Sequence, residues 1–300
     1  MTNVLITGAS GFLGSAVVAR LIEAGHNVTG VDPAPAKTGS YRHIQDDLSD
    51  AKELAHLLAA ERISHVLHCG GVSGPMVLAD QPRRIIEINV NGSLNLLYAS
   101  IDAGVQTYVQ CSSVSAVGNF YESEPIGDDY PLRPTTTYGC SKAAVDMVLR
   151  GLWRRTPLDI CSLRFTSIYG PGRQTEFIVD DIARAAVRGD PYVAEATTDW
   201  PYVYIDDAAD AAVAACFSTK RQQLFYYIAY PQQVSVEQLA AEAAANSKRP
   251  ARISMSDSPQ CSSRGPLDIA PAQRDFGFSP KVDYREGIRR MVADMRDQET

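Results

Sequence analysis

Short apolar runs alternate with longer amphipathic runs through the first two thirds of the chain. The apolar runs lack polar alternation, which is typical of strands covered on both faces. We predict strands at 4–7, 28–32, 66–69, 108–111 and 160–165, separated by helices at 12–24, 51–60, 83–102 and 138–155. Because parallel strands need crossover connections, this alternation predicts a doubly wound parallel α/β sheet of the Rossmann type.

The pattern loosens after residue 172. We predict helices at 177–188, 206–217, 235–245 and 284–295, strands at 202–205 and 225–229, and a proline- and serine-rich stretch at 250–271. We therefore divide the chain into residues 1–172 and a smaller C-terminal α/β part, residues 173–300. Some elements of the second part are expected to return to the first sheet. The remainder would cap the carboxyl ends of the strands, where open α/β sheets bind ligands.

Composition and charge exclude several classes of protein. The chain is 45% hydrophobic and 21% charged, with a net charge of -7, which fits neither a disordered chain nor a nucleic-acid-binding protein. No apolar run approaches the roughly 18 residues that span a bilayer. No basic leader is visible at the start, and the six cysteines are widely spread without a C-x-x-C pair. We therefore expect a cytoplasmic protein without a zinc site or a disulfide framework.

The histidines narrow the chemistry further. All five lie at or before His68, so neither a Ser–His–Asp triad nor a histidine-rich metal site can be built from the rest of the chain. We expect no metal, and catalysis by Ser, Thr, Tyr, Lys, Arg or carboxylates instead.

A glycine-rich turn follows the first strand and opens the first helix. Gly8 permits the tight turn, Gly11 lets the backbone approach a pyrophosphate, and Gly14 allows close packing of helix on strand. Asp32 ends the second strand about 20 residues later, where a carboxylate binds an adenosine ribose and repels a 2′-phosphate. No arginine follows directly, so we predict NAD rather than NADP. The candidate contacts in the turn are Gly8, Ser10, Gly11, Phe12, Leu13 and Gly14.

Tyr138 and Lys142 form a Y-x-x-x-K pair. Positions i and i+4 share one helix face, so the ammonium group can lie near the phenol. Free tyrosine is too weak a base at neutral pH, whereas a nearby cation and the positive nicotinamide favour its phenolate. We predict Tyr138 as the general base, and Lys142 as a group that supports it and holds the nicotinamide ribose.

Together these motifs resemble the extended branch of the short-chain dehydrogenase/reductase superfamily, the NAD-dependent epimerase/dehydratase family. The resemblance covers nearly the whole chain and includes the runs at 164–172 and 204–207. It implies that Tyr138 and Lys142 also contact the cofactor. The further NAD contacts that it implies are Asp47 and Leu48 beside the adenine, the small residues Cys69, Gly70 and Gly71, and Asn89 at the start of the central helix.

The same resemblance implies a catalytic hydroxyl in the loop at 111–118. Counting back from Gly118 in the family's S-S-x-x-x-x-G pattern gives Ser113, which would bond the reacting oxygen. Ser112 is the alternative. Ser115 fits less well because it should point elsewhere on the loop.

The substrate contacts are less sharply defined. Family members that act on nucleotide sugars often carry an asparagine that holds the diphosphate, and Ser167 stands in its place. The run His68–Ser73 resembles that of uronate dehydrogenases, in which the serine contacts a sugar acid. Arg173 and Arg264 are candidates for binding a carboxylate or a diphosphate. The predicted substrate contacts are Ser73, Ser113, Ser167, Arg173 and Arg264.

These residues favour an NAD-dependent enzyme that oxidises a secondary alcohol of a small sugar, sugar acid or related hydroxy compound. The alternative is a nucleotide-sugar 4-epimerase that retains its NAD. A third class is a non-catalytic NAD-sensing protein, which the intact catalytic residues disfavour. A dehydratase would need acidic residues just after the catalytic hydroxyl, and the sequence has none there. We expect a carbohydrate substrate, no nucleic acid, no membrane and a homodimer.

Overall fold

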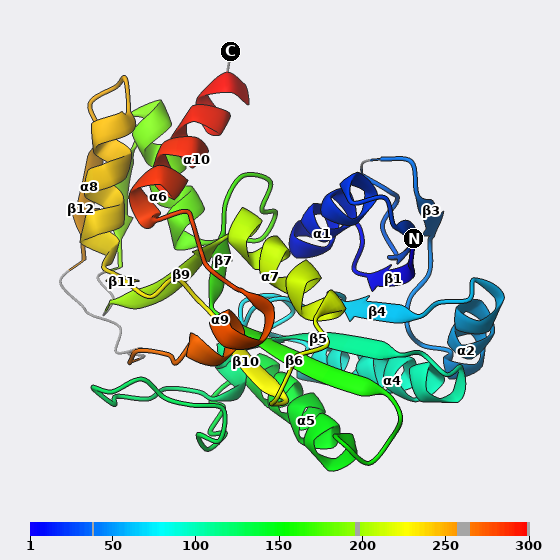
Figure 1. The fold of residues 1–300 in the computed structure, drawn as a ribbon. Helices are drawn as coiled ribbons and strands as arrows, with labels where there is room; N and C mark the ends of the chain where they lie inside the picture. The colour runs from blue at the N-terminus through cyan, green and yellow to red at the C-terminus, as the bar shows by residue number, and fades with distance from the viewer. Residues whose placement is uncertain (38, 196–198, 257–264, 299–300) are drawn as a thin grey trace.

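A seven-stranded parallel sheet forms the centre of the computed structural model, which describes residues 1–37, 39–195, 199–256 and 265–298 (Figure 1). Its strand order is β3-β2-β1-β4-β5-β6-β10, so the order reverses between β1 and β4. This confirms the predicted doubly wound sheet, and ligands of such sheets bind outside the carboxyl ends of the strands at the point where the order reverses. The strands are β1 (Asn3–Thr7), β2 (Asn27–Val31), β3 (Arg42–Ile44), β4 (His65–His68), β5 (Thr107–Ser113), β6 (Asp159–Phe165) and β10 (Phe225–Ile228).

Helices cover both faces of the sheet. One face carries α1 (Phe12–Glu23), α7 (Ile205–Phe217) and α9 (Ala270–Phe276), and the other carries α2 (Ala51–Ala60), α4 (Ser93–Asp102) and α5 (Thr137–Leu152). Five of the eight buried residues of α7 are alanines, which lets α1 and α7 pack closely over the sheet. The strands are apolar on both faces because each face contacts a helix layer.

The segment before α4 is more complex than the single predicted helix at 83–102. It consists of α3 (Pro82–Ile86), a π-helical turn (Glu87–Gly92) and then α4. A π turn inserts an extra residue into the helix and is often found at functional sites. Here the turn contains Asn89, whose side chain is buried against the loop after β4 and against α5. Periodicity in the sequence does not reveal such an insertion.

A smaller lobe lies beside the carboxyl ends of the central strands (Figure 1). Its three-stranded sheet contains β7 (Ser167–Tyr169), β9 (Trp200–Tyr204) and β11 (Gln233–Val234), and a second pair contains β8 (Pro191–Ala194) and β12 (Arg252–Met255). The helices of the lobe are α6 (Ile178–Arg188), α8 (Val236–Asn246) and α10 (Tyr284–Gln298), which share one hydrophobic cluster. In contrast, β10 pairs with β6 in the central sheet.

Two adjacent aspartates at the start of α7 connect the two parts of the molecule. The buried carboxylate of Asp207 accepts hydrogen bonds from the backbone N–H groups of Lys281 and Val282, each at 2.9 Å. Asp206 forms ion pairs with Arg20 on α1 at 2.9 Å and with Arg290 on α10 at 3.3 Å. These contacts hold α10 and the segment before it against the start of α7.

Three features are absent from the described part of the chain. None of its helices is long and apolar enough to cross a membrane. Its five described cysteines are free thiols. Within the same residues, no group of three or more His, Cys, Asp and Glu side chains is arranged to hold a metal ion.

Candidate active site

The glycine turn brings two segments together at the carboxyl edge of the sheet. Gly8 has a φ of +65°, which residues with a Cβ rarely adopt. A Cβ on Gly8 would lie 2.7 Å from the Cα of Gly70, so the turn touches the segment that follows β4. A Cβ on Gly14 would lie 1.9 Å from the carbonyl oxygen of Gly8. The close packing of α1 on the turn therefore requires glycine at both positions.

The amino end of α1 is suited to bind an anion. Gly11 is its N-cap, no side chain caps this end, and the first turn of the helix contains no acidic residue. Backbone N–H groups and the helix dipole favour negative charge at such a position. Phe12 and Leu13 are half-buried and pack against the hydrophobic cluster of the smaller lobe. The pyrophosphate of a dinucleotide fits this helix end.

Asp32 directly follows β2 and is held in a fixed orientation. Its Oδ2 accepts a hydrogen bond from the backbone N–H of Ser10 at 3.0 Å, and its Oδ1 accepts one from that of Ala34 at 2.8 Å. A carboxylate can accept about four hydrogen bonds, so each oxygen keeps a lone pair for a ribose hydroxyl. The hydroxyl of Ser10 donates to the carbonyl of Pro35 at 2.8 Å, which ties the glycine turn to the loop after Asp32. This arrangement fits the adenosine ribose of NAD.

Asp47 and Leu48 lie between β3 and α2. The exposed Asp47 carboxylate accepts a hydrogen bond from the backbone N–H of Ser49 at 2.8 Å, and hydrogen bonding to Ser49 lowers the pKa of Asp47. Leu48 is half-buried next to the π turn, where a Cβ on Gly92 would lie 3.3 Å from the Leu48 Cβ. The pair is therefore fixed between α2 and the start of the central helix.

A buried chain of hydrogen bonds links β1, β4 and the central helix beneath the site. The Thr7 hydroxyl donates to Nδ1 of His68, Nε2 of His68 donates to the Ser93 hydroxyl at 2.8 Å, and Ser93 donates to the carbonyl of Asn89. The backbone N–H of Gly70 donates to the Thr7 hydroxyl at 3.2 Å. These directions assign the Nε2–H tautomer to His68. Burial lowers the pKa of His68 to about 3, so its ring is neutral.

Asn89 connects the loop after β4 to the catalytic helix. Its Oδ1 accepts from the backbone N–H of Val72 at 2.7 Å, and its Nδ2 donates to the Ser141 hydroxyl at 2.9 Å. A Cβ on Gly71 would lie 2.7 Å from Oδ1 of Asn89 and 4.0 Å from Nζ of Lys142. Cys69 is half-buried just before these glycines. The amide of Asn89 thus positions Gly71 and α5 relative to each other.

Tyr138 and Lys142 lie together on the buried face of α5. Thr136 caps the amino end of the helix, and its hydroxyl accepts a hydrogen bond from the backbone N–H of Gly139 at 3.0 Å. The Nζ of Lys142 lies 5.9 Å from the centroid of the Tyr138 ring and donates to the carbonyl of Cys111 at 3.2 Å. The structure therefore places a phenol and an ammonium group side by side, next to the end of β5.

Ser113 is the last residue of β5. Its Oγ accepts a hydrogen bond from the backbone N–H of Ser115 at 3.1 Å, which leaves the hydroxyl proton free to be donated. The Ser112 hydroxyl is buried and has no hydrogen-bond partner, and Ser112 lies in register with Arg164 on β6. Both serines end the same strand, and Ser113 is the more accessible of the two.

Ser167 and Trp200 contact each other across two strands of the smaller lobe. The indole Nε1 of Trp200 donates to the Ser167 hydroxyl at 2.8 Å. Ser167 begins β7 and Trp200 begins β9, so the contact forms only when these strands pair. No motif or spacing in the sequence indicates a role for Trp200.

Arg173 is half-buried in the loop after β7. Its Nη1 donates to the carbonyl of Ile168 at 2.7 Å, and its guanidinium lies 4.3 Å from the centroid of the Phe177 ring. Ser73 is exposed in the loop after β4, next to the Asn89-bound Val72. Arg264 lies outside the described residues.

Asp180 is a charged residue that the sequence analysis missed. It lies in the first turn of α6 and is 6% exposed, and its Oδ2 has no hydrogen-bond partner. Burial raises the pKa of its carboxyl to about 6. The signal in the sequence is an acidic residue next to Val179 on the face that carries Ile182 and Ala183, all of which are buried.

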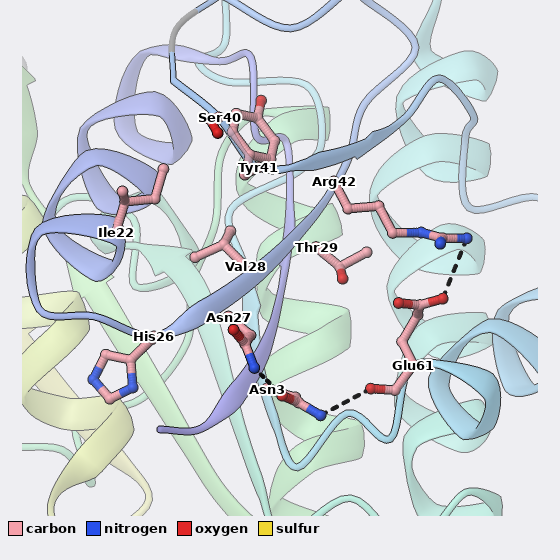
Figure 2. A pocket seen from close by; sticks show the side chains of 10 residues that line it. All are labelled: Asn3, Ile22, His26, Asn27, Val28, Thr29, Ser40, Tyr41, Arg42 and Glu61. Atoms are coloured by element: carbon pink, nitrogen blue, oxygen red, sulfur yellow. Dashed lines mark hydrogen bonds and ion pairs between the residues drawn. The ribbon is translucent and has the colours of Figure 1, made fainter.

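A separate hollow of about 440 Å³ opens at the amino ends of β1 and β2 (Figure 2). Its polar groups bind one another. Asn27 donates to Asn3 at 2.9 Å, Asn3 donates to the carbonyl of Glu61 at 3.0 Å, and Arg42 pairs with the Glu61 carboxylate at 3.2 Å. It lies at the opposite edge of the sheet from Tyr138 and Lys142, so it is separate from the candidate active site.

The glycine turn, the fixed aspartate and the Tyr–Lys pair all lie within the part of the chain that matches a known family. A model of the NAD dependent epimerase/dehydratase family matches residues 4–225, about three quarters of the chain. The chain belongs to this family.

Relatives that match nearly the whole of this chain include sugar-nucleotide epimerases. The chain is 26% identical to the UDP-glucose 4-epimerase of Mycolicibacterium smegmatis over 316 residues, which covers 98% of each chain. It is also 26% identical to UDP-glucuronate 4-epimerase 1 of Arabidopsis thaliana, covering 97% of this chain and 76% of that one.

Solved structures of the family have the same fold. A UDP-glucose 4-epimerase of Thermus thermophilus in complex with NAD matches with a TM-score of 0.87 and 27% identity, covering 98% of this chain and 99% of that one. A UDP-glucose 4-epimerase of Thermotoga maritima with UDP-glucose matches with a TM-score of 0.89 and 25% identity over all of both chains. The protein is thus an NAD-dependent enzyme of the extended short-chain dehydrogenase/reductase type, which confirms the predicted family and cofactor.

Proposed function

We propose that this enzyme is a nucleotide-sugar 4-epimerase. The observation that carries the proposal is the similarity to 4-epimerases over the full length of both chains, which includes the lobe that would contact the substrate. This reading replaces the net oxidation of a small sugar as the leading hypothesis.

The catalytic residues support this chemistry. Held by the glycine turn and Asp32, NAD would supply an acceptor for the hydride of the sugar carbon and a donor that returns it to the opposite face. Tyr138 takes the proton of the reacting hydroxyl and gives it back, and Lys142 provides a positive charge beside the phenol. Ser113 donates a hydrogen bond to the reacting oxygen, since its own Oγ already accepts one from Ser115. The same side chains can serve both the oxidation of the sugar and the reduction of the keto intermediate, as an epimerase requires.

One contact favours a second candidate, the net oxidation of a small sugar or sugar acid. The hydroxyl of Ser167 stands where many nucleotide-sugar enzymes carry an asparagine, and it is occupied by the indole of Trp200. A diphosphate at this position would have to compete with that contact. Arg173, whose guanidinium is oriented by Ile168 and Phe177, would then bind the carboxylate of a sugar acid.

Turnover mode separates these candidates. The purified enzyme, with its NAD content measured, is incubated with nucleotide sugars, sugar acids and free sugars. NADH is followed by absorbance and the sugar products by NMR. A 4-epimerase interconverts a nucleotide sugar with no net NADH, whereas stoichiometric NADH from a small sugar, without nucleotide-sugar turnover, would overturn the proposal.

The homodimer and the cytoplasmic location stay predictions. Tyr98 on α4 and Met147 on α5 expose large apolar side chains and offer a surface for a second copy. Light scattering on the purified protein measures the oligomeric state. Replacing both side chains with polar ones should give a monomer if this surface forms the dimer.

A further inference from the structure

Five buried polar side chains form a continuous chain of hydrogen bonds between the glycine turn and the catalytic helix. They are Thr7 on β1, His68 on β4, Asn89 in the π turn, Ser93 at the start of α4 and Ser141 on α5. Each of the five is at most 2% exposed. Because apolar side chains of the same shape could fill this space at similar stability, the chain indicates a role other than stability.

The direction of these hydrogen bonds is fixed by two backbone carbonyls, which can only accept. The Ser93 hydroxyl donates its one proton to the carbonyl of Asn89, so it must accept from Nε2 of His68, at 2.8 Å. The Ser141 hydroxyl donates to the carbonyl of Tyr138 at 2.7 Å and accepts from the Asn89 amide at 2.9 Å. Each hydroxyl proton is thus committed, and the chain has a single direction.

The same reasoning fixes the end of the chain beside the cofactor turn. His68 donates from Nε2, and its ring is neutral because burial lowers its pKa to about 3. Nδ1 is therefore an acceptor, and the Thr7 hydroxyl must donate to it. A lone pair of the same hydroxyl accepts the backbone N–H of Gly70 at 3.2 Å. Gly70 lies directly against Gly8, so this end of the chain is on the glycine turn.

The other end of the chain is on the first turn of the catalytic helix. Ser141 holds the carbonyl of Tyr138 and directly precedes Lys142 in α5. The Asn89 amide that binds Ser141 also holds the backbone of Val72, accepting from its N–H at 2.7 Å and donating to its carbonyl at 3.2 Å. A displaced Asn89 would therefore move the helix turn that carries Tyr138 and Lys142. Such misplacement is costly for catalysis, because the reacting groups must be aligned.

We propose that His68 is a positioning residue that couples the glycine turn of the cofactor site to the helix turn that carries Tyr138. It acts through Thr7 on one side, and through Ser93 and Asn89 on the other. Its ring holds both ends in register and exchanges no proton with the substrate. The inference rests on the proposed function in taking Tyr138 as the base, whereas its cofactor end does not depend on which sugar is bound.

The test breaks the chain on either side of the ring with nearly isosteric substitutions. Ser93→Ala removes the acceptor for Nε2 of His68, and Thr7→Val removes the donor to Nδ1. Ser100→Ala is the matched control. Ser100 is fully buried on the same helix and makes the same bond as Ser93, to the carbonyl four residues back, which is that of Leu96 at 2.7 Å. Thr7→Ser keeps the hydroxyl and should behave as the wild type.

Both broken chains should bind NAD about 3- to 10-fold more weakly, as the loss of one hydrogen bond would, in equilibrium dialysis of the holoenzyme. Ser93→Ala is the decisive variant, because Ser93 lies outside the glycine turn. In the NAD-loaded enzyme, kcat should fall about 10- to 100-fold with KM nearly unchanged, since the alignment of Tyr138 is disturbed and substrate binding is not. The double variant of Thr7 and Ser93 should be no slower than the slower single variant, because one break suffices.

The control and the ring itself give two further readouts. Ser100→Ala should keep wild-type NAD affinity, kcat and KM, even where its unfolding temperature falls as far as that of Ser93→Ala. In holoenzyme with isotopically labelled histidine, proton–nitrogen NMR should find the ring proton of His68 on Nε2 at neutral pH. A proton on Nδ1, or on both nitrogens, would overturn the inference.

These outcomes separate the inference from the proposed function. If the wild type oxidises sugar acids and epimerises no nucleotide sugar, the epimerase proposal fails, and the same variants decide the inference on that oxidation. If nucleotide sugars are epimerised and Ser93→Ala keeps wild-type kcat or wild-type NAD affinity, the epimerase stands and the inference fails. Equal losses in Ser100→Ala, or additive losses in the double variant, would make the chain merely structural and also overturn it. If the wild type turns over no substrate, the epimerase proposal fails and the NAD affinity of Ser93→Ala decides the inference.

Discussion

Asp146 and Arg164 form a buried ion pair, with 2.9 Å between Oδ2 of the aspartate and Nε of the arginine. Asp146 lies on α5, the helix that carries Tyr138 and Lys142, and Arg164 lies on β6. The Ser162 hydroxyl donates to the other aspartate oxygen at 2.8 Å, and the Phe225 ring lies 3.9 Å from the guanidinium. The arginine of the family motif therefore anchors the catalytic helix to the sheet.

Removing one partner of this pair should destabilise the protein strongly. Asp146→Ala leaves an uncompensated buried guanidinium, and we expect a loss of about 3–5 kcal/mol in the free energy of unfolding. Glu87→Ala is the control, because its partners Arg83 and Arg84 are exposed and such pairs contribute about 0–1 kcal/mol. Denaturant titration measures the free energy of unfolding of both variants. Equal losses in Asp146→Ala and Glu87→Ala would refute the anchoring role of the Asp146–Arg164 pair.

Tyr138→Phe should reduce turnover by about 10²- to 10⁴-fold, because only the proton acceptor is removed. NAD affinity should be retained, since the ring remains in place on α5. Tyr121→Phe, at a tyrosine that is 70% exposed, is the matched control and should be fully active. Activity of Tyr138→Phe near the wild-type level would rule out its role as the base.

Asp32→Ala should weaken NAD binding and reduce the preference for NAD over NADP. The substitution removes the ribose acceptors and the charge that repels a 2′-phosphate, and it frees the N–H groups of Ser10 and Ala34. Titration of both cofactors by fluorescence gives the ratio of dissociation constants. An unchanged ratio would mean that cofactor preference is set elsewhere.

Gly14→Ala should impair folding or NAD binding, because the added Cβ would lie 1.9 Å from the carbonyl oxygen of Gly8. Gly151→Ala provides the comparison within another helix, since no atom lies within 4 Å of its added Cβ. Alanine is favoured over glycine in helices by roughly 0.5–1 kcal/mol, so this control should be as stable as the wild type or more so. Thermal unfolding with and without NAD distinguishes the two variants.

His68 should make the protein sensitive to acid. Its folded pKa of about 3 lies below the ordinary value of 6.5, so the unfolded chain binds a proton first as the pH falls. The contribution of His68 to stability should therefore be constant above pH 6.5 and fall by about 1.4 kcal/mol per pH unit between pH 6.5 and about pH 3. His68→Gln should flatten this dependence, although it lowers stability near neutral pH by disturbing the bonds to Thr7 and Ser93. If the free energy of unfolding had the same pH dependence in the wild type and in His68→Gln, the low pKa of His68 would be contradicted.

The local parts of the site were predictable from the sequence. The glycine turn, the aspartate after the second strand and the Tyr–Lys pair each depend on residues close together in the chain. Their geometry follows from turn sterics and helical spacing, which hold in any surroundings. The alternation of short apolar strands with longer amphipathic helices likewise indicated the doubly wound sheet, because parallel strands need crossover connections.

Only the tertiary structure decided which distant residues meet. Strands β7, β8, β11 and β12 contain two to four residues each, too few for a periodic signal. Their pairing is determined by packing against the larger core. The contact of Trp200 with Ser167 depends on this pairing. Asp180 received its raised pKa only through burial in that lobe. The free energy of these contacts comes from desolvation and close packing between segments far apart in the chain, which no local pattern of residues encodes.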